Sequence, residues 1–329
     1  MITTISDSKN PVLKKFAQMA NENNVSLVII GDVKTPDNFD LKGGNYYSLA
    51  HQKTLDFNLC NDLPENHYAR KNIGYLIAMS NGADIIIDTD DDNEPYSSFW
   101  LKKNRFITLP VVEDKGWLNV YDFFTDINIW PRGFPLNKLH KTITPFEKLL
   151  SKKINTPIQQ GLADGDPDVD AIFRLVINKL ITFSKDRRVA LSKGVWCPFN
   201  SQNTTWWKDT FPLLYLPSNC SFRMTDIWRS FIAQRIAWEN DWNISFHAPT
   251  TYQNRNEHEL MKDFKDEIPG YLNNEKICYE LENLTLMKGM ENIYGNIRTC
   301  YEKLLELEII PDIELTLVEQ WIDDCKQIL

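Results

Sequence analysis

The stretch from Ile85 to Pro95, IIIDTDDDNEP, limits what this chain can fold into more than any other segment. Its three consecutive isoleucines are apolar and β-branched, a pattern that is typical of a strand buried on both faces of a sheet. A cluster of acids follows at once, made of Asp88, Asp90, Asp91 and Asp92. Because ligands of open α/β sheets bind beyond the carboxyl ends of the strands, this segment predicts a binding site at the sheet edge.

The acid cluster favours a divalent metal ion. Crowded carboxylates repel one another unless a cation or hydrogen-bond donors neutralise their charge. Hard oxygen ligands at this density suit Mg²⁺ or Mn²⁺, which commonly bridge protein carboxylates and substrate phosphates. We therefore predict a Mn²⁺ or Mg²⁺ site that receives a diphosphate. The alternative is a solvated acidic turn after the strand.

The N-terminal segments predict a parallel sheet. Apolar runs over residues 2–5 and 25–30 are interpreted as strands, and the apolar stripe between residues 10 and 23 predicts a helix. A β-α-β beginning of this kind implies parallel strands. Asp32 follows the second strand and is expected to hold a base or a ribose, or alternatively to cap a turn. A short third strand is expected over residues 46–50.

A helix is predicted directly before the acidic strand, over residues 64–81, with Gly82 as its C-cap. Its first half carries Arg70, Lys71 and Asn72. Since this helix leads into the acidic strand, these side chains could approach a nucleotide held at the sheet edge. The alternative is an exposed basic helix face.

The later segments predict a helix, a short strand and a helical C-terminal extension. The helix is expected over residues 223–238, where Asp226 is either a cap or a general base aimed into a cleft. A short strand over residues 244–248 carries His247. We predict a sheet domain over residues 1–255 and a helical extension over residues 256–329, which packs on the sheet domain or mediates association into a homo-oligomer.

Four alternating acids in the middle of the chain invite comparison with a calcium loop. They are Asp164, Asp166, Asp168 and Asp170. The run has a proline where calcium ligands should continue and no closing glutamate, so an EF-hand is excluded. Pro167 and Asp168 are interpreted instead as a helix start.

Charge and cysteine usage exclude several classes of protein. The net charge is −9 and no long basic run is present, which argues against nucleic-acid binding through an electrostatic patch. No apolar run approaches the roughly 18 residues that a membrane span needs. The first residues lack the features of a signal peptide, and the six scattered cysteines predict free thiols. We therefore expect a soluble, intracellular, cytoplasmic protein.

The order of these motifs resembles that of nucleotide-sugar glycosyltransferases with the GT-A fold. Many of these enzymes carry a helix of the form A-R-N-x-G followed by a strand that ends in D-x-D. Residues 69–74 read Ala-Arg-Lys-Asn-Ile-Gly, with one extra residue between Arg and Asn, and residues 85–92 supply the strand and the acids. The resemblance implies a mostly parallel, Rossmann-like α/β sheet flanked by helices.

Longer blocks are similar to the STELLO family, the DUF288 glycosyltransferases. They cover roughly residues 60–260 in order and read HYARKNIGYLIAMSNGADIIIDTDDDNEP, IWPRGFPL, QQGLADGDPDVDAIFRL, PFNSQNTTW and SFRMTDIWRSFIAQRIAW. A weaker resemblance extends to the reversibly glycosylated polypeptides, which include UDP-arabinopyranose mutases. Its counterparts here are Asp32, Asp90 to Asp92, the segment Arg132 to Pro135, and the helix start Thr225 to Trp228. Thr225 stands where that family has the first acid of a pair, which leaves Asp226.

The resemblance implies roles at the donor side of the site. Asp90 and Asp92 hold the metal ion against the diphosphate of a nucleotide sugar, with His247 as the candidate third ligand. Asp32 binds the base, and Arg70 approaches the base or the phosphates. The other donor-binding residues that the resemblance implies are Asn72, Asp91, Trp130 and Arg132.

It also implies roles at the acceptor side. Asp226 is the candidate general base for an inverting, single-displacement attack by an acceptor hydroxyl, with Asp168 and Asp170 as alternatives. Trp130 and Arg132 shape the donor or acceptor pocket. In the reversibly glycosylated family the matching arginine is the self-glycosylation site, which keeps that role open for Arg132.

Three functions therefore compete. The first is a glycosyltransferase that moves a sugar from a UDP-sugar to a carbohydrate or other hydroxyl acceptor. The second is a nucleotide-sugar mutase or an autoglycosylating protein. The third is a GT-A-like scaffold without turnover, which the intact acid cluster and Asp226 disfavour.

Overall fold

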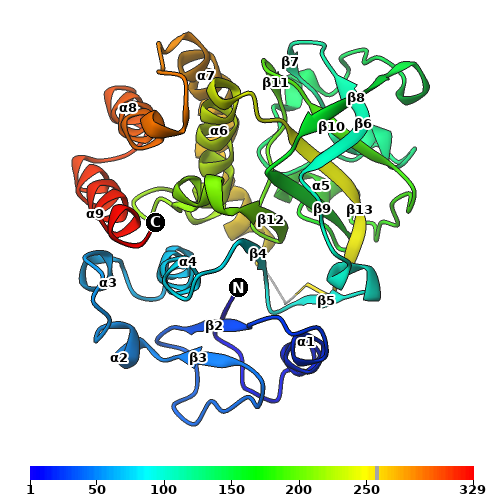
Figure 1. Ribbon diagram of the computed structural model, residues 1–329. Coiled ribbons are helices and arrows are strands. Elements are labelled where there is room, and N and C mark those ends of the chain that lie inside the picture. The colour runs from blue at the N-terminus through cyan, green and yellow to red at the C-terminus, as the bar shows by residue number, and fades with distance from the viewer. Residues whose placement is uncertain (256–258) are drawn as a thin grey trace.

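The computed structural model describes residues 1–255 and 259–329 as an α/β fold in which the last helices of the chain lie together on one side of the strands (Figure 1). A parallel sheet with the spatial order β1-β2-β3 comprises β1 (Ile2–Thr4), β2 (Val28–Gly31) and β3 (Asn45–Tyr47). A mixed sheet follows the order β4-β12-β9-β13-β10-β6-β8. Its strands are β4 (Ile85–Thr89), β12 (Asn203–Trp207), β9 (Ile158–Gly165), β13 (Ile244–Gln253), β10 (Arg188–Leu191), β6 (Phe106–Val112) and β8 (Leu150–Asn155).

The two sheets meet where β1 lies alongside β4. The Thr89 amide donates a hydrogen bond to the Met1 carbonyl at 3.1 Å, and the Met1 amine donates to the Ile87 carbonyl at 2.9 Å. Shorter pieces complete the strands: β5 (Asn93–Pro95) pairs with the end of β13, and β7 (Gly116–Trp117) pairs with β11 (Val195–Trp196). The junction brings the carboxyl ends of β1, β2 and β4 to a common edge. The predicted α/β class is confirmed, although the second sheet is mixed rather than mostly parallel.

The predicted N-terminal unit is confirmed, with changes at its ends. Helix α1 (Pro11–Glu22) begins after Asn10, whose side chain accepts hydrogen bonds from the first free amides of the helix. The third strand is shorter than expected, because the chain turns into helix α2 (Leu49–Gln52) and then α3 (Leu59–Asp62). The isoleucine run does form β4, yet Ile85 is exposed and only Ile86 is buried.

The helix before the acidic strand is shorter than predicted. Helix α4 spans Lys71–Ser80, and Gly82 follows it with a φ of +75°, which suits the predicted C-cap. The preceding residues form a loop, because the Asp32 carboxylate accepts hydrogen bonds from the amides of Asn66 and His67 at 2.7 and 2.9 Å. This loop is thereby held over the end of β2.

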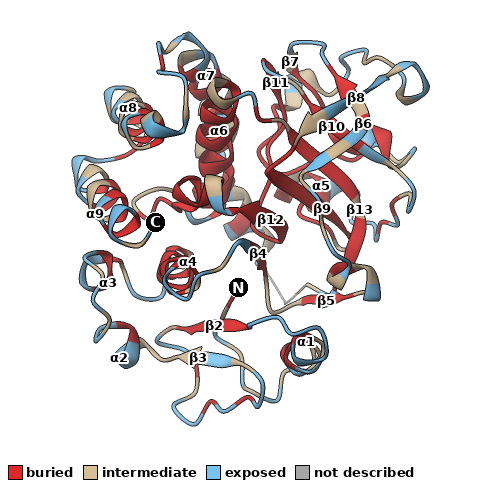
Figure 2. Ribbon diagram, in the orientation of Figure 1, coloured by how far each residue is buried: buried red, intermediate tan, exposed pale blue. Residues whose placement is uncertain are grey.

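The C-terminal extension is helical, as predicted. It consists of α7 (Leu260–Asn283), α8 (Ile293–Glu306) and α9 (Asp312–Ile328). Helix α6 (Thr225–Ala237) lies between these helices and the strands, and all of its residues are buried (Figure 2). The predicted division after residue 255 adjoins residues 256–258, which lie outside the described part of the chain, and it stays a prediction. One apolar cluster runs from Val28 in β2 to Trp321 in α9.

Buried polar side chains also join the extension to the rest of the fold. The carboxylate of Glu314 in α9 is fully buried and accepts hydrogen bonds from Tyr215 Oη at 2.5 Å and from the amides of Ser218 and Asn219. Asp324 accepts from the amides of Asn58 and Leu59. The extension is therefore tied to two separate loops of the sheet-containing part.

Glu314→Ala should lower the free energy of unfolding by about 3 kcal/mol, because it leaves several buried donors without an acceptor. Denaturant unfolding measures this. Glu319→Ala is the matched control on the same helix, since its carboxylate is partly exposed and pairs with Arg298 at the surface. Its change should stay within about 1 kcal/mol. Equal effects of the two substitutions would contradict the structural role of Glu314.

None of the described helices combines the length and apolar character needed to cross a membrane. All six cysteines are free thiols, as predicted, and five of them are buried.

Candidate active site

A pocket of about 580 Å³ opens at the common edge of β1, β2 and β4. The walls come from the carboxyl ends of these strands, the loop before α4, the start of α6, the end of β13 and the start of α7. Its ionisable lining residues are Asp32, Lys34, His67, Tyr68, Arg70, Asp90, Asp91, Asp92, Arg132, Asp168, Arg223, Asp226, Arg255 and Lys262. Carboxylates and cations thus face the same space.

The three acids after β4 have different partners. The Asp91 carboxylate accepts hydrogen bonds from the hydroxyls of Thr4 and Ser6, which hold it against β1. Asp90 Oδ1 accepts from Tyr68 Oη at 2.9 Å and pairs with Lys71 Nζ at 2.8 Å. No described residue donates a hydrogen bond to its Oδ2.

Asp92 is the acid that best fits a bound cation. Its Oδ1 is buried and has no hydrogen-bond partner among the described residues, while Oδ2 accepts only from Gln253 Nε2 at 3.3 Å. Burial, together with the charges of Asp90 and Asp91, raises the pKa of Asp92 to about 7. Such a carboxylate is stabilised by a proton or by a metal ion. Within the described ranges no three His, Cys, Asp or Glu side chains are already gathered as a metal cluster, so ligand oxygens would complete the coordination.

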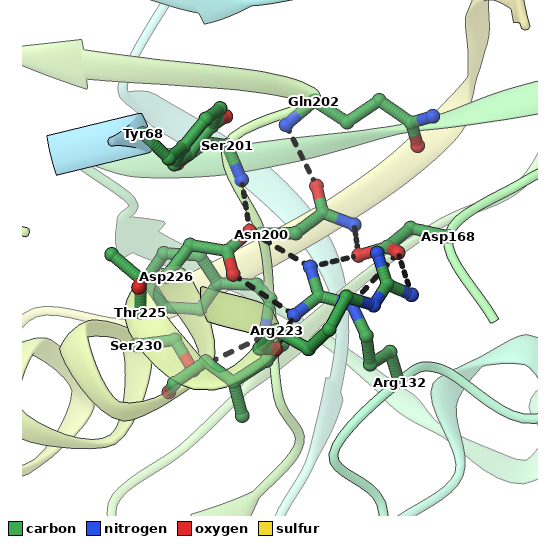
Figure 3. Close-up of polar contacts among 12 residues, drawn as sticks. Tyr68, Arg132, Asp168, Asn200, Ser201, Gln202, Arg223, Thr225, Asp226 and Ser230 are labelled. Atoms are coloured by element: carbon green, nitrogen blue, oxygen red, sulfur yellow. Dashed lines mark hydrogen bonds and ion pairs between the residues drawn. The ribbon is translucent and has the colours of Figure 1, made fainter. Parts of the chain in front are cut away.

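Arg132 forms a clamp between two other acids of the pocket (Figure 3). Its Nε and Nη2 donate to both oxygens of Asp168 at 2.9 and 2.7 Å. Its Nη1 and Nη2 donate to both oxygens of Asp226 at 3.0 Å each. All three side chains are buried. Such two-sided, bidentate pairing fixes both carboxylates and leaves no guanidinium nitrogen of Arg132 free.

This clamp bears on the predicted general base. Asp226 does not cap α6, and its oxygens are shared with Arg132 and the Ser201 amide. Burial would raise the pKa of Asp168, but the Arg132 guanidinium outweighs burial and holds that pKa well below its usual range. Asp170 lies outside the pocket lining and caps helix α5 (Ala171–Val176) by accepting from the Phe173 amide at 2.8 Å.

Two arginines supply positive charge on the side of the C-terminal helices. Glu267 of α7 is fully buried, accepts from Arg223 Nε at 3.0 Å and from the Ala171 amide at 2.7 Å, and so fixes Arg223 in the wall. Arg255 is different, because its side chain is only 8% exposed and the carboxylate that pairs with it among the described residues, that of Asp263, is 3.9 Å away. No described residue accepts a hydrogen bond from its Nε.

The surroundings of Arg255 favour an anionic ligand. Burial lowers the pKa of Arg255 to about 9, and the neighbouring charges of Arg223 and Arg174 act in the same direction. Among the described residues, the ion pair of Arg255 is the long one with Asp263, whereas buried charges normally have close partners. The pocket therefore has an acidic side at the end of β4 and a basic side at Arg223 and Arg255.

The remaining predicted residues divide into two groups. Asp32 and Arg70 line the pocket, although Arg70 is buried and donates to Gln52 Oε1 and to loop carbonyls. Asn72 and Trp130 lie in the interior instead. The Asn72 side chain exchanges hydrogen bonds with the backbone of Leu216, and Trp130 Nε1 donates to Asp170 at 2.7 Å.

His247 also lies apart from the acids. It pairs with Arg188 and Gly161 across the sheet, six positions along β13 from Gln253, the residue that contacts Asp92. Six extended residues span about 20 Å. The structure therefore does not bring His247 together with Asp90 and Asp92, and it places this side chain in another pocket.

One pocket residue, Phe222, was missed at the sequence level, and Lys71 and Asp88 differ from what the sequence suggested. Lys71, for which an approach to a nucleotide and an exposed basic face were both considered, is fully buried and pairs with Asp88 at 2.7 Å as well as with Asp90. Asp88 is therefore buried in the interior of the fold, where Arg229 is its second ion-pair partner at 3.3 Å. Phe222 is 47% exposed and lines the pocket beside the rings of His67 and Tyr68. An exposed aromatic ring at a pocket rim was detectable only from the folded chain.

The fold is GT-A-like, and the pocket lies at the sheet edge where this class of α/β protein binds its ligands. Residues 223–329 match the family model described as STELLO glycosyltransferases. The chain is 30% identical over 249 residues to "Probable glycosyltransferase STELLO1" of Arabidopsis thaliana, covering 69% of this chain and 32% of that protein. It is 28% identical over 329 residues to "Probable glycosyltransferase STELLO2" of the same plant, covering 91% of this chain and 41% of that protein.

These matches confirm the predicted resemblance to the STELLO family, which is a glycosyltransferase family. The matched region covers 32% of the length of the first relative and 41% of the length of the second, so the chain spans less than half of either protein.

Proposed function

We propose that this chain is a metal-dependent glycosyltransferase that moves a sugar from a nucleoside-diphosphate sugar, with UDP-sugars as the first candidates, to an acceptor hydroxyl. The proposal rests on one observation: a buried carboxylate oxygen and a buried guanidinium nitrogen line the same pocket without a hydrogen-bond partner among the described residues. Among the described residues, Asp92 Oδ1 is buried without a donor and Arg255 Nε is buried without an acceptor. A diphosphate with a divalent cation satisfies both.

The acidic side would hold the cation. Asp92 Oδ1 and the second oxygen of Asp90 are the available ligands, and Lys71 and Tyr68 fix the Asp90 carboxylate in place. Mn²⁺ or Mg²⁺ bound there would stabilise the negative charge of the departing diphosphate. Arg255, with Arg223 beside it, would receive the phosphate oxygens.

The organic parts of the substrates have matching surfaces. Phe222 and Tyr68 present rings on which a base or sugar ring can pack. Asp32 adds a carboxylate at the end of β2 for ribose or base donors. Lys34 and Lys262 extend the positive charge around the pocket.

We assign the transfer step to a single displacement. The acceptor oxygen forms a bond to the anomeric carbon, the bond from that carbon to the diphosphate oxygen breaks, and the acceptor proton passes to a carboxylate. Asp226 is our candidate for this base, with Asp168 as the alternative, because both line the pocket and Asp170 does not. Either carboxylate must exchange one Arg132 contact for the acceptor hydroxyl.

Self-glycosylation at Arg132 has little support from the contacts. The side chain is 6% exposed and each of its three nitrogens already donates to a carboxylate. A mutase would rearrange a UDP-sugar in the absence of acceptor, whereas a transferase would show only slow hydrolysis. Chromatography of the nucleotide sugars after incubation distinguishes the two.

Calorimetric titration of UDP, GDP, CDP and ADP, each with and without Mn²⁺, tests the proposal directly. We expect one nucleotide to bind with a strong dependence on the metal ion. The same nucleotide should bind more weakly to Arg255→Gln, by about tenfold or more, because a charge-assisted hydrogen bond is lost. Absence of binding by all four nucleotides under both conditions would overturn the transferase and the mutase together.

A further inference from the structure

A second pocket, of about 760 Å³, shares no lining residue with the candidate active site. Its lining comes from residues 96–104, the entry to β10 over residues 185–188, residues 247–250 of β13, and Ile107 of β6. None of its residues was predicted to bind an anion. The lining includes His247, the histidine that the sequence suggested as a metal ligand.

An irregularity in β13 builds this pocket. The pairing of β13 with β9 shifts register between His247 and Thr251, which frees the intervening backbone for other partners. The Ala248 amide donates to the Arg187 carbonyl at 3.1 Å, and the Thr250 carbonyl accepts from the Tyr96 amide at 2.9 Å. Backbone hydrogen bonds thus tie the first three segments together.

The lining is strongly cationic. It holds one carboxylate, Asp186, and five basic side chains, which are Lys102, Lys103, Lys185, Arg187 and Arg188. Lys185 and Arg187 have carboxylate partners in Asp164 and Glu147. No carboxylate of the described residues lies within ion-pair distance of Lys102, Lys103 or Arg188, although the whole chain carries a net charge of −9.

The contacts of the two central cations are weak. Among the described residues, Lys103 Nζ donates only to the Phe99 carbonyl at 3.3 Å, and Arg188 Nη2 donates only to Gln159 Oε1 at 3.5 Å. Burial lowers the pKa of Lys103 to about 8, and the positive charge of Arg188 contributes to the same shift. Burial, followed by the charge of Lys103, lowers the pKa of His247 to about 3, so the imidazole is neutral and adds a polar wall without a further charge.

We propose that this pocket is a binding site for a phosphate-type oxyanion, held by Lys103 and Arg188 with Lys102 at the rim. The group belongs to a free inorganic or small organic phosphate, or to a phosphorylated carbohydrate. This site is independent of nucleotide binding at the active site, and its occupancy does not require that the proposed transferase activity be correct.

Titration calorimetry in phosphate-free, low-salt buffer tests the proposal with two probes, inorganic pyrophosphate and glucose 6-phosphate. We use the Arg255→Gln variant as the starting protein, so that the basic side of the active site contributes less to the signal. Saturable binding of pyrophosphate identifies a site for a free anion. Binding of glucose 6-phosphate alone identifies an anion carried on a carbohydrate. Absence of both overturns the proposal.

A double variant locates the bound anion. Lys103→Met with Arg188→Gln, made in the Arg255→Gln protein, should weaken binding by about tenfold or more, because two charge-assisted contacts are lost. The matched control is Lys152→Met with Arg298→Gln in the same protein, since both of these exposed cations pair with surface carboxylates outside the pocket. Its affinity should be unchanged.

Two further results bear on the outcome. The NMR resonances of His247 should shift on titration of the starting protein and stay fixed in the double variant, provided that both proteins show the same thermal midpoint. Equal binding by the double variant and the control would overturn the assignment to this pocket. Nucleotide binding at the active site should persist in Lys103→Met with Arg188→Gln made in the native chain, which separates this proposal from the proposed function.

Discussion

Replacing Arg132 with methionine should lower the free energy of unfolding by about 3–5 kcal/mol, because two buried carboxylates lose their shared counter-ion. The guanidinium donates to both oxygens of Asp168 and of Asp226, and all three side chains are buried. Methionine fills a similar volume, so the loss is one of charge compensation rather than of packing. Chemical denaturation followed by tryptophan fluorescence measures it.

The variants around this clamp make the test specific. Arg298→Met removes an exposed arginine that pairs with Glu319, and it should cost less than about 1 kcal/mol. Adding Asp226→Asn to Arg132→Met should recover part of the lost stability, because one uncompensated charge is removed. If the double variant has a lower free energy of unfolding than Arg132→Met, charge compensation by Arg132 is not what stabilises this region.

Asp92→Asn should weaken metal-dependent nucleotide binding by about 100-fold, which corresponds to about 2.7 kcal/mol. The amide keeps the shape of the side chain but lacks the charge that a cation requires. In the native protein, binding should strengthen between pH 6 and pH 8, since the pKa of Asp92 is raised to about 7 and the metal ion needs the ionised form. Titration of the Mn²⁺-nucleotide pair at several pH values measures both effects.

The stability of the same variant provides an independent check. A carboxyl group whose pKa is raised on folding stabilises the fold below its ordinary pKa, and that stabilisation is lost as the pH rises through about 7. At pH 8 Asp92→Asn should therefore be at least as stable as the native protein. Asp126→Asn, an exposed aspartate outside the pocket, serves as the control and should change neither property. A native-like affinity of Asp92→Asn would show that the cation is held elsewhere.

Sequence patterns predicted the elements whose signal is local. The strand from Ile85, the helix after Asn10 and the amphipathic C-terminal helices each follow from periodicity and capping within a few residues. The acid cluster was placed correctly at the sheet edge, because a buried strand that runs into aspartates can end only at an edge. The resemblance to the STELLO family rested on longer blocks.

Local sequence patterns did not predict the contacts inside the site. The Arg132 clamp joins residues 36 and 94 positions apart, and no local spacing encodes that meeting. For Lys71 the sequence allowed either an approach to a nucleotide or an exposed basic face, and it did not predict burial, because the burial depends on Asp88, which lies on another element. Strand β9 was missed altogether, since its eight buried residues include polar side chains such as Gln160 that hydrogen-bond inside the sheet and hide the apolar pattern.

The buried contact between Glu267 and Arg223 has a practical meaning for anyone who trims this protein. The C-terminal helices lie together on one side of the strands in Figure 1, which invites the design of a shortened chain that ends before Leu260 and keeps the two sheets. Such a fragment would lack Glu267, which fixes both Arg223 and the first amide of α5. It would keep the acids at the end of β4 but lose the residue that orients Arg223 in the basic wall of the pocket. Its failure to bind a nucleotide would therefore say nothing about the intact chain.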